Sequence, residues 1–136
     1  MTLTRRIIKV TNVKHRMVMP HVGYVRLAIF DDHSSHDVKK AVLKMKKKGM
    51  KALILDVRNN PGGLLTAATD ISDLFLDSTK LSNPLIVSTK GRSKGSNQRI
   101  NATPHSLVPN MPIVVLINHG SASASEIVAS ALAEHN

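Results

Sequence analysis

Two nearly unbroken apolar segments constrain the fold of this chain more than any other feature. They are Ala52–Val57 (ALILDV) and Pro112–Asn118 (PIVVLIN), and both have the pattern expected of a strand buried on both faces. Each is followed first by turn-forming residues and then by apolar residues at helical spacing. Alternating strands and helices predict an α/β layered fold with a largely parallel sheet.

The other segments fit the same alternation. The predicted helices cover residues Ser34–Lys48, Leu64–Leu76 and Ala124–His135, and further strands are predicted at Gly23–Phe30 and Pro84–Thr89. Ile7, Ile8 and Val10 suggest one more strand, whereas the polar, glycine-rich stretch Lys90–Asn110 reads as a long exposed loop.

Local signals mark the ends and the buried face of the first predicted helix. Ser34 and Asp37 form an S-x-x-D start signal, and Gly49 is a plausible stop. Its apolar residues Val38, Val42 and Met45 recur at helical spacing and should face the core. In the second helix the corresponding stripe is Leu64, Ala68, Ile71 and Phe75.

Composition limits the classes of protein that need to be considered. The 136 residues, 42% of them hydrophobic, suffice for one domain with a single core. No window approaches the roughly 18 apolar residues that a membrane span requires. The first residues lack the pattern of a secretory signal, and the chain has no cysteine for disulfides or thiolate metal sites.

The net charge of +10 raises the question of nucleic-acid binding. Much of the charge lies on the first predicted helix, in a lysine-rich block whose apolar residues point elsewhere, so a solvated face is the simpler interpretation. Single-strand binders usually add aromatic platforms, and this chain has only one Tyr and two Phe. No nucleic-acid partner is therefore expected, although a basic surface could attract acidic partners or anionic membranes.

The first turn that could take part in catalysis or binding is Asn59–Gly63, just after the strand Ala52–Val57. In parallel sheets, reactive groups gather beyond the carboxyl ends of the strands. Gly62 and Gly63 would let backbone N–H groups approach a ligand, and a developing oxyanion could be held there. The alternative is an ordinary tight turn, for which Pro-Gly-Gly is a common sequence.

The second such turn is Asn118–Ile127, which follows the strand Pro112–Asn118. Small residues after a buried strand place a hydroxyl on a sharp turn at the mouth of a helix, as in a nucleophile elbow, although the G-x-S-x-G pattern is absent. Ser123 and Glu126 also have the spacing of a capping box, which would explain this serine without catalysis.

Taken together, the strings LDVRNNPGG and GSASASEI, the latter shortly after PIVVLIN, resemble the C-terminal processing (tail-specific) peptidase family. The resemblance runs from about Gly23 to the end of the chain. It implies a crotonase-like α/β fold and a cofactor- and metal-free serine endopeptidase acting near protein C-termini. Ser123 would be the nucleophile, and the oxyanion donors would be the N–H of Ala124 and one from Gly62 or Gly63.

The resemblance also implies that residues 1–136 are a catalytic core truncated at both ends. The family's base is a lysine beyond a further strand, and the chain ends at Asn136 before that position. We therefore expect this fragment to be inactive, and its exposed core surface to favour oligomers or non-native association. The family's PDZ domain is missing as well, and Thr2–Val13 resembles the strand that leaves it. The parent protein is expected to be exported.

Several alternatives remain open from the residues alone. Ser121 and Ser125 are read as helix-start and packing residues. His33 and His36 could seed a metal site, but no third ligand is evident. His119 could pair with the serine, and Asp31 with Asp32 could form a carboxylate pair or simply start a turn. A non-catalytic binding module on the same scaffold is the alternative at the level of function.

Overall fold

The computed structural model of the chain describes residues 12–81, 85–89, 98–104 and 106–135. Its elements, in chain order, are β1 (Val13–Met19), β2 (Val22–Leu27), α1 (Ser34–Lys47), β3 (Ala52–Asp56), α2 (Leu65–Phe75), a short 3-10 helix (Ser78–Lys80), β4 (Leu85–Thr89), β5 (Gln98–Asn101), β6 (Ile113–Leu116) and α3 (Ala124–His135).

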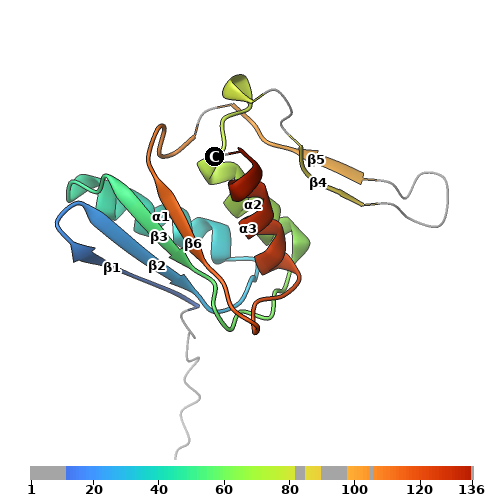
Figure 1. Ribbon diagram of the computed structural model, residues 1–136, viewed down its shortest axis with the longest axis horizontal. Coiled ribbons are helices and arrows are strands. Elements are labelled where there is room, and N and C mark those ends of the chain that lie inside the picture. Colours follow the sequence, from blue (N-terminus) through green and yellow to red (C-terminus); the bar gives the residue numbers. More distant parts are fainter. Residues whose placement is uncertain (1–11, 82–84, 90–97, 105, 136) are drawn as a thin grey trace, which may run out of the picture.

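The main sheet has four strands in the order β1-β2-β3-β6 (Figure 1). β1 and β2 pair antiparallel, whereas β2, β3 and β6 run parallel. In the parallel part Leu55 of β3 lies between Val25 of β2 and Val115 of β6. The predicted fold class, an α/β structure with a largely parallel sheet, is confirmed.

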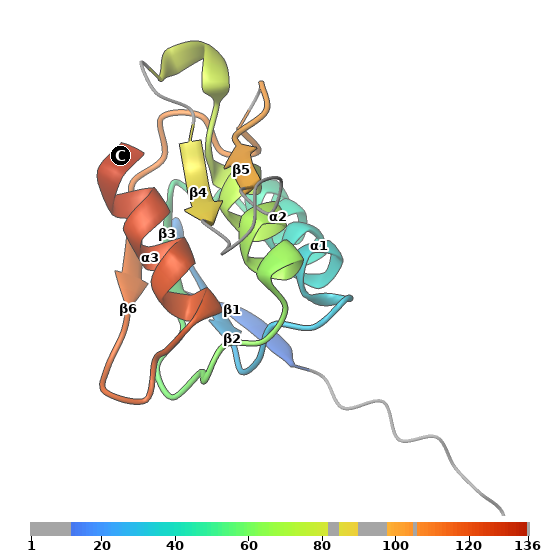
Figure 2. The same cartoon turned by 90° about the vertical axis from the view of Figure 1, so that its right-hand side faces the viewer.

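The core lies between one face of this sheet and the helices (Figure 2). Val25, Leu53 and Leu55 alternate along β2 and β3 onto that face and are fully buried. On the opposite face Val114 of β6 is 55% exposed. The prediction that PIVVLIN is buried on both faces is therefore wrong for the part of the chain that the structure describes, because the helices cover only one side.

α1 follows the sequence pattern closely and begins at Ser34 as predicted, but its first turn is capped differently from the S-x-x-D expectation. Val38, Val42 and Met45 are buried, and Gly49 adopts a positive φ of 89° just beyond the helix. Ser34, however, is the first helical residue and not the cap. Its hydroxyl accepts a hydrogen bond from the Asp31 N–H at 2.8 Å, so the predicted capping box does not form.

The polar segments contain strands that the pattern did not reveal. β5 lies inside Lys90–Asn110, the predicted loop, and pairs antiparallel with β4. β1 was not predicted either, while the strand proposed at Ile7–Val10 lies outside the described residues, as does most of Thr2–Val13. Within the described ranges, no helix has the length and apolar character needed to cross a membrane.

Candidate active site

The two turns singled out by the sequence leave the same edge of the sheet. Asp56, the last residue of β3, pairs with Leu116, the last residue of β6. One residue later the Val57 N–H donates to the Leu116 carbonyl oxygen at 3.0 Å. Because parallel strands end on one side, the glycine turn (residues 59–63) and the serine turn (residues 118–123) start side by side.

The glycine turn and the serine turn are in contact. A Cβ atom placed on Gly62 would lie 2.7 Å from the Cβ of Ser123, 3.0 Å from the carbonyl oxygen of Ala122 and 3.1 Å from the amide nitrogen of Ala124. Gly62 also has φ +108°, which L residues rarely adopt. Glycine at this position therefore lets the serine turn pack directly against the backbone of the glycine turn.

Hydrogen bonds join the same two turns through Asn60. The Asn60 carbonyl oxygen accepts from the Ala122 N–H at 3.1 Å and from the Ser125 hydroxyl at 2.9 Å. Beside it, the Ser121 hydroxyl donates to the Val57 carbonyl oxygen at 2.7 Å. Ser121 and Ser125, expected to be helix-start and packing residues, thus also bind the serine turn to the end of β3.

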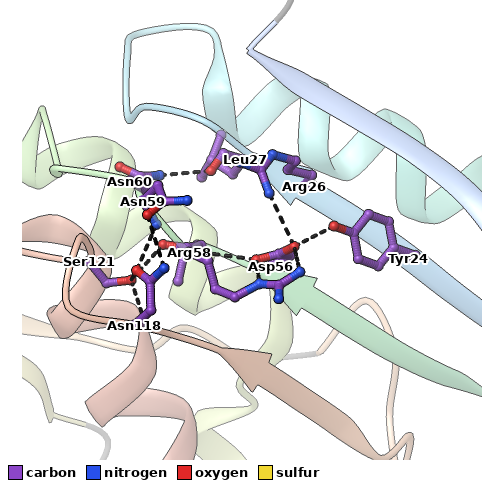
Figure 3. A network of polar contacts seen from close by, with 10 residues as sticks. Tyr24, Arg26, Leu27, Asp56, Arg58, Asn59, Asn60, Asn118 and Ser121 are labelled. Carbon is purple, nitrogen blue, oxygen red and sulfur yellow. Dashed lines mark hydrogen bonds and ion pairs between the residues drawn. The ribbon is translucent and has the colours of Figure 1, made fainter.

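A pair of asparagines closes the outer side of this contact (Figure 3). The Asn118 side chain accepts from the Asn59 N–H at 2.9 Å and donates to the Asn59 Oδ1 at 3.0 Å. It also accepts from the Gly120 N–H at 3.0 Å. Asn59 has φ +61°, a conformation that asparagine tolerates better than most residues. Residues almost sixty positions apart are therefore held in one rigid unit.

Ser123 occupies the most unusual position in the site. Its φ is +53°, and its side chain is exposed. The N–H groups of Glu126 and Ile127 donate to the Ser123 carbonyl oxygen, and within the described part of the chain the Ser123 hydroxyl forms no hydrogen bond. The capping-box alternative is therefore wrong, because the hydroxyl that would cap the helix is left available.

The backbone N–H groups around Ser123 differ in whether they already donate a hydrogen bond within the protein. The Gly62 N–H donates to the Asn60 Oδ1 at 2.9 Å. The N–H groups of Gly63 and Ala124 have no acceptor among the residues that the structure describes. Gly63 forms a parallel bridge with Phe30, whose N–H and carbonyl oxygen bond to residues 62 and 64. The Gly63 N–H therefore points away from Phe30.

Next to the glycine turn lies a buried carboxylate that the sequence reasoning missed (Figure 3). Asp56 accepts from the Arg58 Nε at 3.0 Å and from the Arg58 Nη2 at 2.9 Å, and also from the Tyr24 hydroxyl and from Arg26. Burial acts to raise the pKa of Asp56, but these hydrogen bonds outweigh it and hold the pKa well below its usual range. The hydrogen bonds that Arg58 itself forms with Asp56, together with the charge of that carboxylate, raise the pKa of Arg58. An acidic residue ending an apolar strand, with arginine two positions later, was the available signal.

The alternative sites receive no support from the geometry. No group of three or more potential metal ligands is found within the described ranges, so His33 and His36 have no third partner there. No hydrogen bond joins the exposed His119 to Ser123 in the same part of the chain. Asp31 accepts from the His33 N–H at 3.0 Å and thus forms a turn before α1, as one interpretation of Asp31-Asp32 predicted.

With this geometry in view, comparison with known proteins decides the family. The model of peptidase family S41 matches residues 21–136, most of the chain. The chain belongs to this family. A carboxy-terminal-processing protease of Bartonella bacilliformis is 43% identical over 137 aligned residues, which cover 98% of this chain and 30% of that protein. The chloroplastic carboxyl-terminal-processing peptidase 3 of Arabidopsis thaliana is 43% identical over 81% of this chain and 20% of its own length.

A solved structure agrees with this assignment. The photosystem II D1 C-terminal processing protease superposes with a TM-score of 0.76 at 30% sequence identity, covering 96% of this chain and 36% of the other. The predicted resemblance to C-terminal processing peptidases is confirmed, and with it the α/β fold. This chain spans about a third or less of the length of these relatives.

Proposed function

We propose that this chain is the nucleophile-bearing part of a serine endopeptidase that cleaves proteins near their C-termini. The observation that carries the proposal is the free, exposed hydroxyl of Ser123, held at a positive φ in contact with Gly62. The positive φ of Ser123 distinguishes it from an ordinary exposed serine, because such strained residues cluster at active sites. Membership of peptidase family S41 supports the same reaction class.

In this proposal Ser123 attacks the peptide carbonyl and forms an acyl-enzyme. The tetrahedral oxyanion is stabilised by two backbone amides, of which Ala124, at the N-terminus of α3, supplies one. Of the two candidate glycines, Gly63 is favoured as the second donor, because the Gly62 N–H is already given to Asn60. No cofactor or metal takes part.

The base in this proposal is a lysine contributed by a part of the protein outside residues 1–136. A lysine can accept the serine proton only if burial lowers its pKa toward neutrality. Within the described part of the chain no lysine forms a hydrogen bond with Ser123. The Lys46 side chain, for its part, donates a hydrogen bond to the Leu107 carbonyl oxygen at 2.7 Å. We therefore propose that the 136-residue chain alone has no peptidase activity.

The proposed substrates are polypeptides with an accessible C-terminal tail. The names of the relatives, among them a protease that processes the C-terminus of photosystem II D1, support this class of substrate. A PDZ domain in the parent protein and action outside the cytoplasm are part of the same proposal.

The test is peptide cleavage by the full-length parent protein beside two serine variants. Ser123→Ala should lower kcat by about a thousandfold or more, because the nucleophile is lost. Ser130→Ala removes an exposed hydroxyl on the same helix and should leave turnover unchanged. Equal turnover by the wild type and Ser123→Ala would reject Ser123 as the nucleophile. Tight peptide binding by the wild type without any cleavage would favour the binding-module alternative.

A further inference from the structure

Asn60 connects more segments of this molecule than its place in an apparent turn suggests. Its side chain is fully buried. The side-chain nitrogen donates to the carbonyl oxygen of Leu27 at 3.0 Å, and the side-chain oxygen accepts from the Gly62 N–H at 2.9 Å. The end of β2 and the glycine turn are thereby tied to one amide group.

The main chain of the same residue holds the serine turn. Its carbonyl oxygen accepts two hydrogen bonds, from the Ala122 N–H before the candidate nucleophile and from the Ser125 hydroxyl after it. Ser125 is also fully buried, and it lies 65 positions from Asn60 in the sequence. Both lone-pair directions of one carbonyl are therefore occupied from either side of Ser123.

We propose that Asn60 and Ser125 are positioning residues that set the distance between the Ser123 hydroxyl and the unused amide of the glycine turn. This inference rests on the proposed peptidase function for its catalytic readout, but the geometry it describes does not depend on it. Neither side chain reaches the reacting atoms. Each acts through backbone that it holds in place.

The conformation of Ser123 explains why such support is needed. A non-glycine residue at φ +53° persists only where its surroundings fix it. The bonds to Ala122 and Ser125 hold the residues on both sides of Ser123, so the backbone cannot relax by moving the serine turn away from Gly62. Misplacing a reacting group by about 1 Å can cost on the order of a hundredfold in rate.

The chain offers a closely matched control for Ser125. Ser72 of α2 is likewise fully buried, and its hydroxyl donates to the Ala68 carbonyl oxygen at 2.9 Å, the same length as the Ser125 bond. Ser72→Ala and Ser125→Ala each remove one buried hydroxyl and one hydrogen bond to a carbonyl. They differ in whether that carbonyl belongs to the candidate site.

The catalytic test uses the full-length parent protein. Ser125→Ala should lower kcat by about tenfold to a hundredfold with KM nearly unchanged, because attack and not substrate binding is misaligned. Ser72→Ala should change kcat less than about twofold. Equal effects of the two substitutions on kcat would overturn the positioning role. If Ser123→Ala cleaves as well as the wild type, the proposed peptidase function fails. The positioning role of Asn60 and Ser125 is then decided by the amide hydrogen exchange described below.

The structural test uses the 136-residue chain and needs no activity. Amide hydrogen exchange of Ala122, whose N–H shares the Asn60 carbonyl with Ser125, should accelerate in Ser125→Ala and remain unchanged in Ser72→Ala. If Ser125→Ala does not fold, Ser125→Cys replaces it, since a thiol fills the same buried space but is only a weak donor to the Asn60 carbonyl oxygen. Unchanged Ala122 exchange in the folded variant would refute the inference.

Discussion

Replacing Gly62 by alanine tests whether the glycine turn and the serine turn are held in close van der Waals contact. The substitution has two costs. The first is conformational: φ +108° is unfavourable for a residue with a Cβ, by about 1–2 kcal/mol. The second is steric, because the new methyl group would lie 2.7 Å from the Cβ of Ser123, whereas ordinary contact begins at 3.4 Å. Such overpacking typically costs about 1–3 kcal/mol.

Gly49→Ala isolates the first cost from the second. Gly49 has φ +89°, and a Cβ there would meet its nearest neighbour, a ring nitrogen of His21, at 3.4 Å. This control should destabilise the chain by about 1–2 kcal/mol, and Gly62→Ala by about 2–5 kcal/mol in total. The gain from restricting the unfolded chain is the same in both variants and cancels.

Urea denaturation of the wild type and both variants gives three free energies of unfolding, and hence the loss of stability caused by each substitution. The difference between the variants, about 1–3 kcal/mol, measures the contact between the turns. If Gly62→Ala costs no more than Gly49→Ala, the turns can separate freely and the rigid site described above does not exist.

Three further substitutions probe the same region. Asp56→Asn should lower the free energy of unfolding by about 2 kcal/mol near neutral pH, since charge-assisted hydrogen bonds are lost. The folded pKa of Asp56 lies below its unfolded value of 3.8. The ionised carboxylate therefore stabilises the fold above pH 3.8, and this stabilisation is lost as the pH falls below that value. Urea titrations from pH 7 to 2 should thus show the variant losing less stability than the wild type, and Asp70→Asn, at an exposed carboxylate of α2, should follow the wild type. Ser123→Gly should be more stable than Ser123→Ala by about 1 kcal/mol in thermal unfolding, because glycine accepts φ +53° without strain, and equal melting temperatures would argue against a strained serine. Gly63→Ala should abolish folding as judged by circular dichroism, because its Cβ would lie 2.0 Å from the Phe30 carbonyl oxygen, and a native spectrum would contradict that packing.

The elements that could be predicted from the sequence are those with a strong apolar signal. The helices α1, α2 and α3 were found from apolar residues at helical spacing, and the strands β2, β3, β4 and β6 from short apolar runs bounded by turn-forming residues. β1 (VKHRMVM) was missed because most of its residues are exposed at the edge of the sheet. β5 (QRIN) carries only one apolar residue, so its pairing with β4 leaves no periodic signal.

The site was predictable as a pair of turns but not as a set of contacts. The common edge follows from parallel strands, and the structure does place Gly62 against Ser123. The bonds from Ala122 and Ser125 to Asn60 join distant segments, and no local spacing encodes them. Both capping-box predictions were wrong because the S-x-x-D/E pattern is silent about φ: Ser34 lies inside its helix, and Ser123 is left-handed.

The in-register pairing of β3 and β6 has a consequence for how such a molecule can change during evolution. A slip of one residue in either strand would displace its turn by about 3.3 Å and invert every side chain along it. The segment that links the two turns returns to the far end of the sheet, and β4 and β5 project away from it (Figure 1). Insertions and deletions can therefore accumulate around β4 and β5, while α2, which packs in the core, and the two strands keep their lengths.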